Sequence, residues 1–201
     1  FEGLFKYDLI PTGSQSLVRI HTTGSTSPSN KESVVLNLVS NTQKLDLFIR
    51  DSPTDSSTKH LSLSGVNLYD EDVWHLSFGR KAPHDIGDTD RSVYFLRAAK
   101  QENGEILALY QTSSNYVNVS DSVFVNASSA HNVSGSFVVI GTQKFQAGGS
   151  SKFLNDSSGN VDSLAHSASF EGMVSNCLFW SKFINDSEWK EHVKNHASVG
   201  V

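Results

Sequence analysis

Short stretches in which hydrophobic and polar residues alternate recur along most of this chain, separated by segments rich in Gly, Ser, Asn and Asp. Over 73–78, for example, Trp74, Leu76 and Phe78 occupy every second position. This alternation is typical of a β-strand with one buried face. The pattern predicts strands over 17–21, 34–39, 45–50, 60–64, 73–78, 92–98, 105–111, 123–126, 136–141 and 170–180. We therefore expect an all-β chain whose first strand is 17–21.

The last predicted strand, 170–180, carries Phe170, Val174 and Leu178 at even spacing, which predicts a buried strand. Gly172 falls within this pattern. A glycine at such a position indicates a bend or a close approach of another backbone.

A helix is predicted over 187–195, and three signals mark its start. Asn185 can cap the first free N–H groups, and Glu188 can reach back to complete a capping box. Ile184 and Trp189 stand where a hydrophobic staple would form. The sequence thus predicts a strand that leads directly into a short capped helix.

Many short strands followed by one helix predict an antiparallel two-sheet β-sandwich of jelly-roll type. The longest connecting segments are 22–32, 51–59, 81–91 and 142–165. Neither a composition break nor a repeat divides the chain. We expect a single domain over 1–201, excised from a longer polypeptide.

The charge pattern and the single cysteine narrow the function classes. The net charge is −5, and the 16 Lys and Arg residues are scattered, whereas nucleic-acid binding needs a basic stripe. No apolar run approaches the roughly 20 residues that span a bilayer. Cys177 is the one cysteine, so an internal disulfide framework is excluded. We interpret it as a small buried hydrophobic residue. We therefore expect neither nucleic-acid binding nor a membrane span.

Four segments, 73–78 with its Trp-His pair, 92–105, 137–141 and 170–188, occur in an order that resembles the laminin-G-like, concanavalin A-like jelly-roll superfamily. Pentraxins and many lectin-type modules belong to it. The usual Asp-Gly turn of the second segment is replaced by Asn103-Gly104. The C-terminal tail is also similar to that of such domains in large phage and algal-virus virion proteins. The resemblance implies an extracellular or virion-surface location.

The resemblance also implies calcium as a candidate cofactor, held at the rim of the sandwich by acidic loops. The segment 83–90 contains Asp85, Asp88 and Asp90 around a glycine. Clustered carboxylates repel one another unless a cation or Arg91 neutralises them. Local hydrogen bonding in turns is the alternative explanation for these residues.

Sugar binding is the ligand chemistry that we expect at the rim loops 81–91 and 111–122. Its candidate residues are His84, Asp85, Asp88, Asp90, Asn115 and Tyr116. A tyrosine ring such as that of Tyr116 can stack on the apolar face of a pyranose, although an ordinary half-buried loop tyrosine fits the pattern as well. Tyr69 and Tyr110 are further candidates near loop ends, and the tryptophans Trp74, Trp180 and Trp189 are interpreted as core or staple residues.

Catalytic patterns are weak by comparison. The acidic residues at 70–72, and Glu102 with Glu105, fit polar turns better than the carboxylate pair of a glycosidase. No Gly-x-Ser-x-Gly motif occurs, although Ser, His and Asp are common enough to leave a triad open. His192 and His196 are four residues apart and share a helix face. Without a third ligand nearby in the sequence, a solvent-facing helix surface fits this pair better than a zinc site.

The leading hypothesis is a non-catalytic carbohydrate-binding or adhesion module of a larger extracellular or virion-surface protein. Its partners would be a glycan or glycoprotein and other domains of the same polypeptide or virion. The alternative is a structural protein–protein module of a capsid, fibre or tail without sugar binding. A glycan-active enzyme domain is the third hypothesis.

Overall fold

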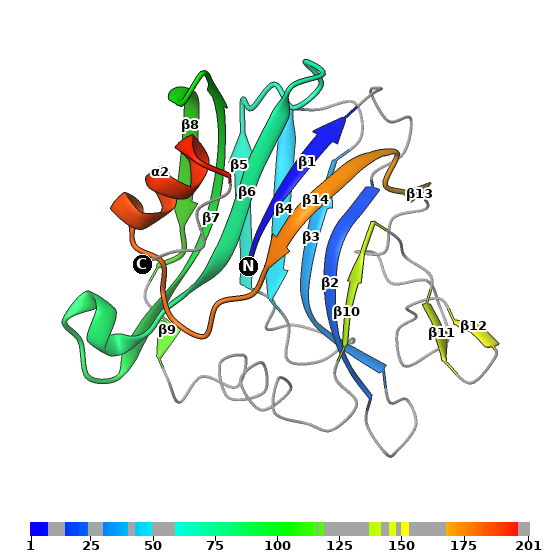
Figure 1. The fold of residues 1–201 in the computed structure, drawn as a ribbon. Coiled ribbons are helices and arrows are strands. Elements are labelled where there is room, and N and C mark those ends of the chain that lie inside the picture. The colour runs from blue at the N-terminus through cyan, green and yellow to red at the C-terminus, as the bar shows by residue number, and fades with distance from the viewer. Residues whose placement is uncertain are drawn as a thin grey trace.

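The computed structural model describes residues 1–7, 15–23, 30–39, 43–49, 59–115, 117–118, 137–141, 145–147, 150–152 and 168–196. Within these residues the chain forms two sheets that face each other, and one α-helix, α2 (Asp186–Lys194) (Figure 1). The prediction of an antiparallel two-sheet β-sandwich with one short C-terminal helix is thus confirmed, while its jelly-roll connectivity stays a prediction. No helix in this part of the chain has the length and apolar character needed to cross a membrane.

The first sheet, called the β1 sheet, has the strand order β14-β1-β6-β7-β8. Its neighbouring strands run antiparallel, and the short strand β9 also pairs with β7. A 3-10 helix, η1, lies between β6 and β7. The bounds are β1 (Glu2–Tyr7), β6 (Val73–Lys81), η1 (Pro83–Ile86), β7 (Arg91–Glu102), β8 (Glu105–Ser113), β9 (Val117–Asn118) and β14 (Gly172–Leu178).

The second sheet, called the β2 sheet, has the order β10-β2-β3-β4-β5, in which consecutive strands from β2 to β5 form hairpins. The short strand β13 pairs with β2 in parallel, and β11 and β12 form a separate ribbon. The bounds are β2 (Gln15–Thr23), β3 (Asn30–Leu38), β4 (Lys44–Ile49), β5 (Lys59–Ser64), β10 (Phe137–Ile140), β11 (Phe145–Ala147), β12 (Ser150–Lys152) and β13 (Ala168–Ser169). The predicted strand 123–126 lies outside the described residues.

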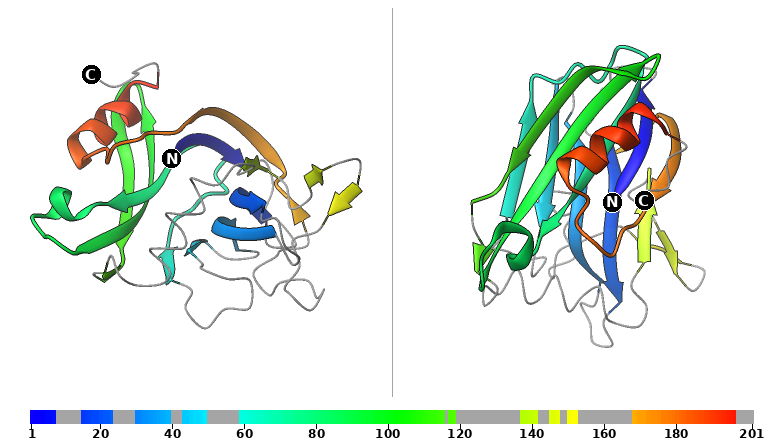
Figure 2. Two further views of the ribbon diagram at one scale, coloured as in Figure 1. Left: turned by 90° about the horizontal axis from the view of Figure 1, so that it is seen from below. Right: turned by 60° about the vertical axis from the view of Figure 1, so that its left-hand side comes forward.

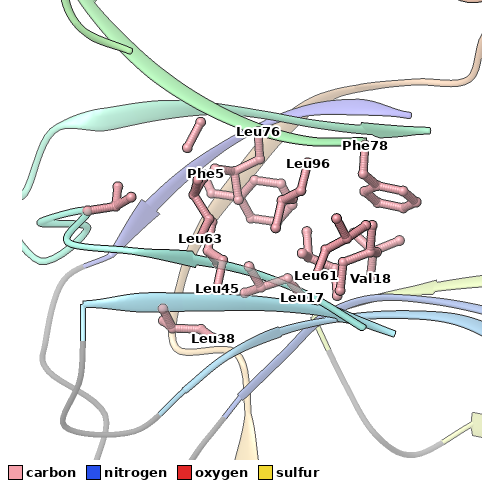
Figure 3. Close-up of a cluster of buried hydrophobic side chains, with 14 of the residues drawn as sticks. Phe5, Leu17, Val18, Leu38, Leu45, Leu61, Leu63, Leu76, Phe78 and Leu96 are labelled. Carbon is pink, nitrogen blue, oxygen red and sulfur yellow. The ribbon is translucent and has the colours of Figure 1, made fainter. Parts of the chain in front are cut away.

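The core lies between the two sheets, as Figure 3 shows. Trp74, Leu76 and Phe78 of β6 point into it, as the alternation predicts. From the opposite sheet, Leu45 and Leu47 of β4 fill the same interior and are fully buried. Full burial of a side chain of this size contributes about 1.5–3 kcal/mol, so this layer of residues supplies the main driving force for folding.

The first strand is β1, not 17–21 as the alternation predicts. It pairs with β14 on one side and with β6 on the other. Phe5 and Tyr7 face the core, whereas Glu2 and Leu4 are buried on the other face of the sheet. A strand that is buried on both faces does not show the alternation of a half-exposed strand, which is why the pattern misses it.

The last strand, β14, is an edge strand, so the prediction of a buried strand is wrong. Val174 packs against the core, but Met173 lies on the opposite face and is 56% exposed, and β14 has a neighbour on one side only in the sheet order. The close backbone approach predicted at Gly172 is confirmed: an added Cβ would overlap the carbonyl oxygen of Lys6. Cys177 is half-buried and thus less enclosed than expected.

The predicted strand-to-helix connection forms as expected. The Asn185 side chain accepts hydrogen bonds from the backbone N–H groups of Ser187 and Glu188, at 2.9 and 3.0 Å. The Glu188 carboxylate accepts one from the Asn185 N–H at 2.9 Å, which completes the capping box. Ile184 and Trp189 are buried in one small cluster, as a staple requires. Figure 2 shows α2 on the outer face of the β1 sheet, where it contacts β7 and β8.

Candidate functional site

A groove of about 550 Å³ lies between the end of β6 with η1 and the segment 179–184 that leads into α2. We call it the Trp180 groove. Its lining combines aromatic side chains with polar ones: Phe1, Phe78, Phe95, Trp180 and Phe183 among the former, and Arg80, His84, Asp85 and Lys182 among the latter. This mixture is typical of ligand sites in which rings supply contact area and a few polar groups fix the orientation.

The aromatic lining is held in place by contacts among the rings. The rings of Phe1 and Phe78 stack with centroids 5.1 Å apart, and those of Phe95 and Phe183 meet edge to face at 5.5 Å. Gly79 makes room for Phe95, because a Cβ at that position would lie 3.0 Å from the ring. The rings of Phe95 and Phe183 therefore support each other at the groove wall, while the Phe78 ring faces the core and supports Phe1.

Arg97, on the outer face of β7, fixes the segment that carries Phe183. Its Nη1 donates to the carbonyl oxygen of Ile184 at 3.0 Å, and its Nη2 donates to Asp186 Oδ1 at 2.7 Å. The guanidinium carbon lies 4.2 Å from the ring centre of Phe95 and 5.3 Å from that of Trp189. Burial lowers the pKa of Arg97 from its ordinary value, and the charge of Asp186 opposes that effect. A buried arginine thus ties the 183–186 backbone to the sheet.

Trp180 connects the groove to a buried polar cluster. Its indole N–H donates to Glu2 Oε2 at 3.2 Å, and its ring stacks on the ring of His192 with centroids 5.4 Å apart. The Nδ1 of His192 lies 2.9 Å from the same carboxylate oxygen, and the Nε2 of His75 lies 3.8 Å from it. We call Glu2, His75, Trp180 and His192 the Glu2 cluster.

The expected solvent-facing surface around His192 is wrong, because the His192 side chain is buried against the Glu2 carboxylate. His75 lies on the face of β6 opposite Trp74, as predicted, and α2 contributes to covering that face. Burial raises the pKa of the Glu2 carboxyl, but the interactions with His75 and His192 outweigh burial, so the pKa lies below its ordinary value of 4.5.

Two of the predicted ligand residues, His84 and Asp85, line the Trp180 groove. Asp85 Oδ2 accepts a hydrogen bond from the Ala82 N–H at 2.7 Å, and Asp85 Oδ1 lies 3.2 Å from His84 Nε2. Asp85 therefore shapes the start of η1 as well as the groove wall.

The other predicted acidic residues of this loop do not face the groove lining. Asp88 Oδ1 accepts hydrogen bonds from the backbone N–H groups of Thr89, Asp90 and Arg91, and its Oδ2 pairs with the Arg91 guanidinium at 2.6 Å. The Asp90 N–H and the Arg91 side chain hold the pKa of Asp88 well below its usual range. Asp90 is exposed. No group of three or more metal-ligating side chains gathers in the described ranges, and Asp88 is neutralised by its own loop.

The second predicted loop contributes less to the site. Asn115 is exposed, and its carbonyl accepts a hydrogen bond from the Ser114 hydroxyl at 2.7 Å. Tyr116 lies outside the described residues. Tyr69 and Tyr110 are half-buried and pack against the core, and the Tyr69 hydroxyl donates to the carbonyl of Val39. These two tyrosines thus support the sandwich.

One Ser-His-Asp combination forms on the outer face of the β2 sheet, but its geometry does not suit catalysis. His60 Nε2 lies 3.0 Å from Asp46 Oδ1 and 3.1 Å from the Ser62 hydroxyl, so a single ring nitrogen faces both groups. The Ser62 hydroxyl donates to Asp46 at 2.7 Å. In a triad, the acid and the nucleophile contact different ring nitrogens. This arrangement is a polar contact between neighbouring strands.

Sequence reasoning assigned Trp180 to the core or the staple and did not single out Lys182 or Phe183. The structure leaves Trp180 and Phe183 half-buried at the groove, whereas Trp74 and Trp189 are fully buried. The sequence feature that could have indicated these residues is the segment 180–183. It joins a strand to a helix cap and carries two aromatic residues and a lysine. Connecting segments on a rigid scaffold often carry function.

No protein-family model matches this chain, and no curated protein matches it. The resemblance to the laminin-G-like superfamily therefore stays a prediction.

Proposed function

We propose that this domain is a non-catalytic carbohydrate-binding module and that the Trp180 groove holds the sugar. The observation that carries the proposal is the composition of the groove, where the half-buried rings of Trp180 and Phe183 adjoin Arg80, His84 and Lys182. An aromatic ring covers the apolar face of a pyranose, and side chains around it can hydrogen-bond the hydroxyl groups.

The acidic residues of the groove support binding over hydrolysis. Glu2 is buried and engaged by His192 and Trp180, and Asp85 binds the Ala82 N–H. Hydrolysis by a retaining mechanism needs two carboxyl groups about 5–5.5 Å apart on either side of the scissile bond, both able to reach the substrate. Both carboxylates already make contacts within the protein, so we infer that they stabilise the structure instead of acting on a substrate.

A glycan array screened with the parent protein and with Phe183→Leu tests the proposal. The leucine keeps an apolar side chain against Phe95 but removes the flat ring, so bound-sugar signal should fall at least about tenfold, which is a loss of about 1.4 kcal/mol. Leu107→Ala is the control, since Leu107 is an exposed apolar side chain of β8 that does not line the groove. Binding that survives in Phe183→Leu, or no binding by the parent across a broad array, contradicts the proposal.

The alternative, a structural protein–protein module, is favoured by a different observation. Met173 of β14 is 56% exposed and Phe179 beyond it is 53% exposed, both along the edge of the β1 sheet. Edge strands with exposed apolar residues readily pair with other chains. Under this alternative, the parent self-associates in sedimentation velocity at high concentration, and Met173→Lys abolishes the association while the array stays blank.

A further inference from the structure

The Glu2 cluster joins four segments that are far apart in the sequence. Glu2 comes from β1, His75 from β6, Trp180 from the segment before α2, and His192 from α2 itself. All the pairings converge on one carboxylate oxygen of Glu2, whose side chain is 2% exposed. The other oxygen, Oε1, is buried without a hydrogen-bond partner. The buried Glu2 carboxylate therefore links the β1 sheet to Trp180 and His192 of the C-terminal segment.

The cluster sets the position of the groove wall. Trp180 lines the Trp180 groove, yet its indole N–H is held by Glu2 and its ring lies on His192. A change in the charge of Glu2 therefore acts directly on a groove residue. The helix α2 is also held by the apolar contacts of Trp189 and Val193 and by the two hydrogen bonds of Arg97, so loss of the Glu2 contacts should loosen the segment without unfolding the sheet.

The titratable groups that face Glu2 are basic. They come from the segments packed around it: the amino group of Phe1 just before β1, His75 on β6, Arg97 on β7 and His192 on α2. His196, just after α2, faces His75 with ring centroids 6.0 Å apart. Asn176 of β14, which donates to the His196 carbonyl, is neutral. One carboxylate thus lies among several basic groups that come from different segments.

We propose that the Glu2 cluster is an acid-sensitive switch that loosens 179–196 from the β1 sheet and so changes the shape of the Trp180 groove. Regulation of ligand release by this switch rests on the proposed sugar-binding function. The loosening of 179–196 does not depend on that function.

Two titrations act in the same direction. Glu2 has a lowered pKa in the folded state, so its stabilising effect is present above its ordinary value of 4.5 and is lost as the pH falls through the folded value. Burial and then the charge of His75 lower the pKa of His196 from 6.5. The unfolded chain therefore takes up this proton first, and folding weakens as the pH falls below 6.5. As the pH falls below 6.5, these two titrations therefore both destabilise the contact of 179–196 with the β1 sheet.

Burial also lowers the pKa of the Phe1 amino group to about 6. The charge of Glu2 opposes this lowering, so Glu2→Gln also alters the Phe1 titration, whereas a variant that keeps Glu2 leaves that interaction in place.

Hydrogen exchange of the whole chain, followed by mass spectrometry at about pH 7 and about pH 4 and corrected for intrinsic rates, tests the switch. In the parent, 179–196 should lose protection in acid while β3 and β4 stay protected, because the lowered pKa values of Glu2 and His196 make the docked segment less stable as protons bind. Glu2→Gln should already be less protected at neutral pH and show a smaller further drop. Glu171→Gln is the matched control, because Glu171 is exposed.

His75→Asn provides a second variant that keeps Glu2, and its acid drop should be smaller than that of the parent. The switch is overturned if protection of 179–196 falls only together with β3 and β4, or if Glu2→Gln and His75→Asn both keep the full acid drop. If the glycan array shows no binding but hydrogen exchange of 179–196 responds to acid as expected, only the sugar-binding proposal is contradicted. Equal sugar affinity at both pH values would contradict the regulatory role.

Discussion

Replacing Arg97 by methionine removes the buried guanidinium that ties the 183–186 backbone to β7, while the methionine keeps most of the apolar stem. The guanidinium donates to the Ile184 carbonyl and to Asp186, and it lies over the rings of Phe95 and Trp189. The variant loses all of these contacts at once. It therefore measures how far one buried charge holds the groove wall in place.

The expected loss follows from three contributions. The buried Ile184 carbonyl loses its donor from Arg97, which costs about 1–3 kcal/mol. The Asp186 side chain is 48% exposed, so water replaces much of that ion pair, and its loss adds less than about 1 kcal/mol. Methionine carries no charge, so the variant avoids the cost of burying the guanidinium, and this offsets part of the loss in stability. We expect a net destabilisation of about 2 kcal/mol, or about 4–8 °C in Tm for a chain of this size.

Urea unfolding followed by circular dichroism measures the loss, and hydrogen exchange shows whether 179–196 opens first. Arg91→Met is the matched control, because Arg91 is exposed and water weakens its ion pair with Asp88, so the stability should change little. A change of less than about 0.5 kcal/mol for Arg97→Met would refute the reasoning, because it would mean that packing alone holds the segment.

Two further predictions concern the sandwich. Gly172→Ala should destabilise the fold by about 2 kcal/mol or more in urea unfolding, because the new Cβ overlaps the Lys6 carbonyl and forces β14 away from β1; unchanged stability would contradict this close approach. Asp46→Asn should cost about 1 kcal/mol at neutral pH and less at about pH 3. Burial raises the pKa of Asp46, but hydrogen bonds from Ser62 and His60 outweigh it, so the lowered pKa gives a stabilisation that is lost in acid. An equal loss of stability in Asp46→Asn at both pH values would contradict the lowered pKa of Asp46.

Much of the fold was predictable because its signals are local. The alternation of Trp74, Leu76 and Phe78 predicts a half-buried strand without reference to any other part of the chain. The capping box of Asn185 and Glu188 likewise needs only four consecutive positions. The missed strand β1 is the instructive exception, since burial on both faces removes the alternation on which such predictions depend.

Less of the candidate site was predictable. His84 and Asp85 were found because they stand in a polar loop, but the opposite wall comes from 179–184, about a hundred positions later in the chain. Trp180 was placed in the core because tryptophan is usually buried, and His192 was placed in solvent because it lies on a terminal helix. In both cases the partner, Glu2, comes from the other end of the chain.

The amino-acid sequence alone determined the class of the fold, most of the strands and the capped helix, because these depend on periodicity and on contacts between near neighbours. Only the tertiary structure decided which strands form the edges, that the first and last strands are neighbours, and that a glutamate near the start of the chain lies among histidines and a tryptophan from elsewhere. The physical reason is that pairing and burial depend on which distant segments meet in space. The Trp180 groove and the Glu2 cluster both arise from such meetings.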